Sequence, residues 1–218
     1  MITSSATSRS LLNGPIPIQN EVRTPVSMGD SPSGIVLSPN ATQSQIDSFD
    51  RAIGHLNLST TFQSLWQSIH ASQVTFTVVF IDTAHVRFNP QSRNIYWNPY
   101  QGLVMTNGAV QNAALGLAHE MAHALQYLEG DWCHQFGQFS MTMDEAEADV
   151  LARFETPIAR ELGQPTRANY RAVQGVRTMN NSTHFVTVHS RSLRDQIVYG
   201  LSRQYSIYHN FWADPRPA

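Results

Sequence analysis

The sequence predicts an α+β fold, a single domain in which a small sheet packs on one long apolar helix. β-branched and aromatic residues fill the segments 74–82 and 94–99, which is the composition of strands. The segment 109–129 is mostly apolar and has the length of a helix, and Gly130 is placed to end it. A chain of 218 residues is long enough to bury a core of this kind.

Further helices are expected on both sides of this unit. Thr42 and Ser59 can each cap a helix whose apolar residues recur at helical spacing. Downstream, helices are expected over 143–155 and 157–162, with Pro157 marking a break between them.

The two ends of the chain differ in composition. The first 40 residues are rich in Ser, Thr, Pro, Gly and Asn, so 1–40 is expected to be a disordered leader and 41–218 the folded domain. The leader has no basic segment followed by an apolar one, as a conventional signal peptide would. Near the other end, a strand over 183–190 and an amphipathic helix over 192–205 are expected, which makes the C-terminal part mostly helical.

Composition excludes some functions. A net charge of −2 gives no electrostatic case for binding nucleic acid or an anionic membrane, and no apolar run is long enough to span a bilayer. The single cysteine cannot form an internal disulfide. All 14 basic residues are arginine. The lack of lysine has two open explanations: avoidance of ubiquitin attachment inside a eukaryotic cell, or an arginine-biased genome.

The strongest chemical signal is an H-E-x-x-H motif within the apolar helix, formed by His119, Glu120 and His123. Residues four apart on a helix lie on one face, so the two imidazoles can bind one metal ion. Glu120 is rotated by about 100° and can take a proton from a metal-bound water. Apolar neighbours argue against two merely exposed histidines. We therefore expect one Zn²⁺ per chain.

A third zinc ligand is expected from the acidic segment D-E-A-E-A-D at 144–149. Glu145 is the first candidate, because it lies four residues before Asp149, which can then accept the outer N–H of a ligating histidine. Glu147 is the alternative ligand.

Farther along, Arg167 and Tyr170 form an R-x-x-Y pair. A guanidinium and a phenol are suitable donors to the oxyanion of peptide hydrolysis. A surface arginine and a core tyrosine would give the same pattern.

These motifs resemble those of known zinc proteases. H-E-M-A-H followed by E-A-E-A-D resembles the gluzincin arrangement, in which the glutamate of an E-x-x-x-D helix is the third zinc ligand. The resemblance implies a zincin-like fold, with the active helix under a small sheet whose edge strand holds the substrate in extended form. The segment I-Y-W-N-P at 95–99 is the expected edge.

A narrower resemblance comes from the R-x-x-Y pair, which is similar to one at the zinc site of clostridial neurotoxin light chains. The segment 153–171 also resembles the region after the acidic helix in type III-secreted zinc metalloprotease effectors of the NleD/HopH kind. The likeness covers roughly 94–171. It implies that the leader is an export signal with a secretion chaperone as a partner, and that the chain acts as a virulence factor in the host cell cytoplasm.

Together these observations predict a zinc-dependent endopeptidase that cleaves a host protein. His119, His123 and Glu145 would hold zinc, Glu120 would act as the base, and Tyr170 with Arg167 would stabilise the oxyanion. The alternative is a non-proteolytic zinc-binding regulator or interaction protein inside the cell that uses the same motif.

Overall fold

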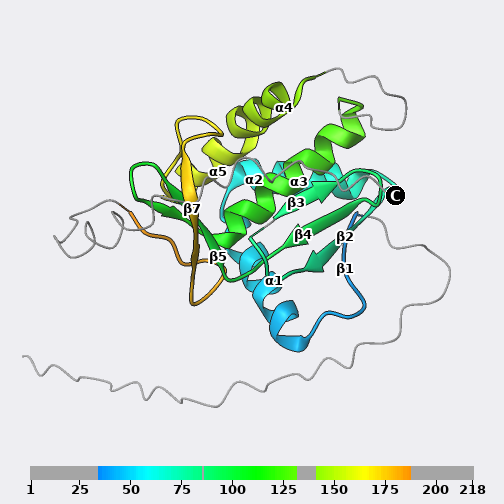
Figure 1. Ribbon diagram of the computed structural model, residues 1–218. Helices are drawn as coiled ribbons and strands as arrows, with labels where there is room; N and C mark the ends of the chain where they lie inside the picture. The colour runs from blue at the N-terminus through cyan, green and yellow to red at the C-terminus, as the bar shows by residue number, and fades with distance from the viewer. Residues whose placement is uncertain (1–33, 85, 132–140, 188–218) are drawn as a thin grey trace, which may run out of the picture. The chain divides into compact units, whose positions relative to one another are not determined.

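The computed structural model describes residues 34–84, 86–131 and 141–187, which form an α+β unit (Figure 1). A four-stranded sheet has the order β1-β2-β4-β3, and a second sheet has the order β6-β5-β7. The strands of the first sheet are β1 (Gly34–Leu37), β2 (Thr75–Phe80), β3 (Arg87–Asn89) and β4 (Asn94–Trp97). Those of the second are β5 (Gln101–Met105), β6 (Val110–Gln111) and β7 (Val173–Thr178).

The first two helices begin where the sequence predicts. Thr42 caps α1 (Gln43–Leu56) with a capping box, and Ser59 caps α2 (Thr60–Ala71). Both helices pack against α3 (Ala113–Glu129), the long apolar helix of the prediction. Gly130 ends α3 in the left-handed region, with φ 84°, where a side chain would be strained.

Helix α3 is the centre of the core. It contacts both neighbouring helices and strands of both sheets, and its N-terminal turn receives a hydrogen bond of 2.8 Å from the indole Nε1 of Trp97 to the carbonyl of Ala113. The helix begins later than the expected position 109, because Val110 and Gln111 pair with β5 and Asn112 serves as the N-cap.

Two other expectations are corrected. The segment Gly34–Leu37 pairs with β2, so part of the expected leader 1–40 belongs to the sheet; 1–33 lie outside the described residues. The expected edge strand, β4, lies inside the sheet between β2 and β3. The edge next to α3 is instead β3, a strand too short to stand out in the sequence.

The helical run after position 142 is continuous. It comprises α4 (Met143–Val150), a π-helical turn η2 (Leu151–Glu155) and α5 (Thr156–Glu161). Pro157 does not break this run, because it falls in the first turn of α5, where its missing N–H is tolerated.

After α5 the described chain enters a strand, β7, which the sequence did not predict. Of the expected strand 183–190, Val186 bridges to Val110, and the remainder beyond 187 lies outside the described residues, as does the expected helix 192–205. Within the described part of the chain, no helix is long and apolar enough to cross a membrane.

Candidate metal centre

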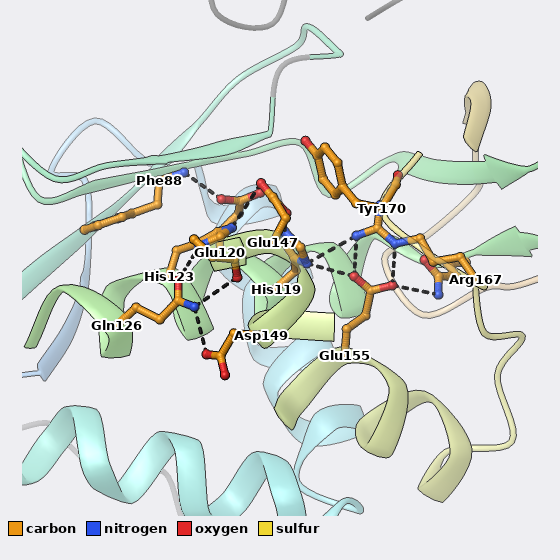
Figure 2. A network of polar contacts seen from close by, with 12 residues as sticks. Phe88, His119, Glu120, His123, Gln126, Glu147, Asp149, Glu155, Arg167 and Tyr170 are labelled. Carbon is orange, nitrogen blue, oxygen red and sulfur yellow. Dashed lines mark hydrogen bonds and ion pairs between the residues drawn. The ribbon is translucent and has the colours of Figure 1, made fainter. Parts of the chain in front are cut away.

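His119 and His123 lie on one face of α3, where both side chains are buried. Their Nε2 atoms approach the carboxylate of Glu147, a buried residue of α4, at 3.1 Å and 3.4 Å (Figure 2). One nitrogen or oxygen from each of the three side chains lies within 4.8 Å of the others. This group, His119, His123 and Glu147, is called the metal cluster below.

The other ring nitrogen of each histidine is held by an acceptor. His119 Nδ1 lies 2.8 Å from Oε2 of Glu155, and His123 Nδ1 lies 2.8 Å from Oε1 of Gln126. Gln126 uses its amide nitrogen on the carbonyl of Ala146, so its oxygen is the acceptor. Both histidines therefore carry a proton on Nδ1 and, when neutral, turn the lone pair of Nε2 toward Glu147.

The metal cluster fits a cation. Glu147 Oε2 is buried, and apart from the ion-pair contact of 3.1 Å with His119 Nε2 it has no hydrogen-bond partner among the residues that the structure describes. Three groups that present lone pairs to one another need a positive charge between them, either a proton or a metal ion. Two imidazoles and a carboxylate are a ligand set that zinc takes in catalytic sites.

The protonation of His119 and that of Glu147 depend on each other. Burial by itself lowers the pKa of His119, but the carboxylates of Glu147 and Glu155 raise it to about 10. Burial raises the pKa of Glu147, yet the two histidines bring it down to about 2. The metal-free cluster thus holds a proton where a metal ion would bind.

Glu120, the residue next to His119, has a buried carboxylate. Its Oε2 accepts a hydrogen bond of 2.7 Å from the backbone N–H of Phe88 in strand β3. Burial raises the pKa of Glu120, and the two histidines and this N–H act in the opposite direction. A carboxyl with a raised pKa beside a metal cluster is suited to general base catalysis.

One residue of the metal cluster, His119, lines a cavity of about 620 Å³. His119 and Glu120 line it together with residues of β5, of β7 and of the turn before β3. A molecule in the cavity can therefore reach Glu120 and His119 from this side.

Glu145 does not join the metal cluster, which corrects the first candidate for the third ligand. It is exposed, and its carboxylate closes a capping box with Thr142 at the start of α4. Glu147 lies two residues farther along, about 200° around the helix, and faces α3. The alternative ligand is thus the residue that the structure brings to the histidines.

Arg167 is placed differently from the expected oxyanion donor. It is buried, its guanidinium pairs with both oxygens of Glu155, and its NH1 donates to the carbonyl of Tyr170. Its nitrogens are committed to the protein, so its role is to position Glu155 and, through it, His119. The ring of Tyr170 stacks on that of His119 with centroids 6.3 Å apart, and Tyr170 lines the cavity (Figure 2).

Asp149 also contacts a metal-cluster histidine only indirectly, through Gln126. Its Oδ2 accepts from Nε2 of Gln126, which in turn holds His123, so Asp149 is not itself the acceptor of a histidine N–H. Gln126 and Glu155, the two residues that hold the histidines, were missed in the sequence. A signal existed for Gln126, which is a polar residue in an apolar helix, three positions after His123.

Comparisons of the chain with family models, with curated proteins and with solved structures returned no match. The function is therefore argued from the site.

Proposed function

We propose that this chain is a zinc-dependent endopeptidase. The observation that carries the proposal is the buried metal cluster with the carboxylate of Glu120 beside it, at the wall of an open cavity. A structural zinc site is closed by four protein ligands, whereas three protein ligands and an adjacent base are typical of hydrolytic sites.

His119, His123 and Glu147 would hold the zinc, which supplies Lewis acidity and lowers the pKa of water. Glu155 and Gln126 fix the two imidazoles by their outer N–H groups. These contacts turn the Nε2 atoms of both histidines toward Glu147.

Proton transfer belongs to Glu120. The N–H of Phe88 fixes one oxygen of its carboxylate, and the carboxylate takes the proton of the attacking water and later delivers it to the departing amine. Tyr170, which lies beside His119 in the cavity, is the candidate donor to the oxyanion.

The setting in which the enzyme works is part of the proposal and rests on the sequence. A Ser-rich leader, a single cysteine and the absence of lysine are features that suit export by a type III-like system into a host cytoplasm. The substrate is then a host protein.

The test is a search for new protein N-termini in a eukaryotic cell lysate treated with the zinc-loaded chain. Wild type should generate a discrete set of new N-termini, and Glu120→Gln should retain zinc but generate none. Glu145→Gln, the same chemical change on an exposed residue, is the matched control and should cleave as wild type does. If wild type binds zinc and produces no new N-termini, a non-proteolytic regulator replaces the proposal.

A further inference from the structure

Gly116 is the one residue between Gln111 and Gln126 that is not buried. It lies one turn before Glu120 on α3 and lines the cavity beside His119 and Glu120. The one partly exposed position in this stretch of the helix therefore faces the cavity, as do its neighbours His119 and Glu120.

Folding does not require a glycine here. A Cβ built on Gly116 would meet no heavy atom within 4 Å among the residues that the structure describes. Gly116 is also absent from the residues with positive φ. Glycine destabilises a helix relative to alanine, which occurs five times elsewhere in this helix, at 113, 114, 118, 122 and 124. The described part of the chain thus makes no use of the space above Gly116 in its packing.

The cavity that Gly116 lines has apolar side chains among its polar ones. Leu103 of β5 and Val176 of β7 are directly paired across the second sheet, so they share a face, and both line the cavity. Ala84 and Val86, before β3, line it as well. An apolar stem placed here would leave water for an apolar surface.

One polar group in the same cavity lacks a partner. Gln101 of β5 lines the cavity, and its Oε1 is buried without a hydrogen bond from any residue that the structure describes. A buried acceptor without a donor is costly, and a ligand that brings a donor removes the cost.

We propose that Gly116 keeps open a pocket for a substrate side chain next to the scissile bond, one with a long apolar stem and a hydrogen-bond donor for Gln101. The pocket rests on the proposed function, because the bond to be cleaved must lie between the metal cluster and Glu120. Gly116 is then a specificity-determining residue: any larger residue at this position shortens the pocket from its floor.

The first experiment profiles cleavage of a proteome-derived peptide library by the zinc-loaded chain. Wild type should prefer large side chains at one position flanking the cleaved bond. Gly116→Leu should reduce the cleavage of those peptides on the order of tenfold or more relative to peptides with glycine or alanine there. Gln101→Met should weaken the preference for side chains with a donor over purely aliphatic ones.

Gly54→Leu is the matched control. Gly54 is also a helical glycine whose Cβ would meet nothing within 4 Å, but it is exposed on α1 and is not among the residues that line the cavity. Both leucine variants should raise the melting temperature, and only Gly116→Leu should alter the cleavage profile. An unaltered profile in Gly116→Leu would overturn the pocket.

A binding measurement separates failure of the pocket from failure of the protease proposal. The probes are two succinyl hydroxamates, one with an isobutyl side chain and one with hydrogen, titrated calorimetrically into the zinc-loaded protein. The isobutyl compound should bind wild type on the order of tenfold more tightly, and Gly116→Leu should abolish the difference. Equal affinity of both compounds for wild type contradicts the pocket, whereas unequal affinity without any peptide cleavage contradicts only the protease.

Discussion

At the scale of single residues, two glutamates of the same helix have different tasks. Glu145 stabilises the start of α4 through Thr142, and Glu147 faces the histidines of α3. The capping box decides this division, because it fixes which side of the helix points outward at its first turn.

Exchanging each glutamate for glutamine tests the division. Removing the hydrogen-bond partner of a metal ligand lowers metal affinity about 10–100-fold. Glu147→Gln changes a ligand itself and removes its charge, so it should lower zinc affinity by at least that factor. Glu145→Gln should retain zinc and lose only a little thermal stability. Competition with a chelator of known affinity measures both. Equal zinc affinity of the two variants would show that Glu147 is not a ligand.

Zinc binding should release a proton. The pKa of His119 is raised to about 10 in the metal-free chain, so this histidine is protonated at neutral pH and zinc must displace the proton. Affinity should therefore rise about tenfold per pH unit between pH 7 and 9. Calorimetry in buffers of different ionisation enthalpy counts the protons, and a pH-independent affinity would contradict the assignment.

At the scale of elements, the π-helical turn η2 connects the metal cluster to the segment after α5. It presents Glu155 to His119 on one side and to Arg167 on the other. Burial by itself would raise the pKa of Glu155, but the Arg167 guanidinium, with His119, holds this pKa below its usual range. A π turn inserts an extra residue and is common at functional sites.

Glu155→Gln should have two separable effects. It leaves the Arg167 guanidinium buried without its counter-charge, which should lower the free energy of unfolding by about 3–5 kcal/mol. It should also lower zinc affinity about 10–100-fold. Adding Arg167→Met should restore much of the stability in urea unfolding but not the zinc affinity. If both properties recover together, Glu155 has no specific task at His119.

The start of α3 is tied to α1 by a polar network sensitive to pH. Asn112 caps α3 through Leu115, and its Nδ2 lies 3.4 Å from His55 Nε2. Gln164 Nε2 lies 3.2 Å from the same nitrogen. Two amide donors face this nitrogen, so His55 is held neutral, and burial lowers its pKa.

Because the folded state disfavours the protonated form of His55, the unfolded state binds more protons below the usual histidine pKa of about 6.5. The free energy of unfolding should fall as the pH drops below that value and should not depend on His55 above it. Urea unfolding of wild type and His55→Gln between pH 5 and 8 measures this. The acid-side loss should be smaller in the variant, and identical pH profiles would contradict the network.

At the scale of the whole molecule, the signals that predicted best were local ones at the ends of helices. Thr42, Ser59 and Gly130 act through hydrogen bonds or dihedral angles within a few residues of themselves, and the structure confirms all three. The strands β5 and β7 were missed because both contain glycine and neither has a clear alternation of polar and apolar residues.

The site was predictable only in part. The spacing of His119 and His123 is a property of one helix, so it follows from the sequence. The positions of Glu147 and Glu155 depend on the phase of another helical run, which Thr142 sets at its start and η2 shifts within it. Arg167 was misassigned because its partner, Glu155, could not be placed without that shift.

The central claim is that His119, His123 and Glu147 bind one zinc ion. X-ray absorption at the zinc edge, combined with metal content by mass spectrometry, tests it most directly. We expect one zinc per chain with only nitrogen and oxygen neighbours at about 2.0–2.2 Å, and loss of the bound zinc in Glu147→Gln. A sulfur neighbour at about 2.3 Å, or no stoichiometric zinc in the wild-type protein, would contradict the claim.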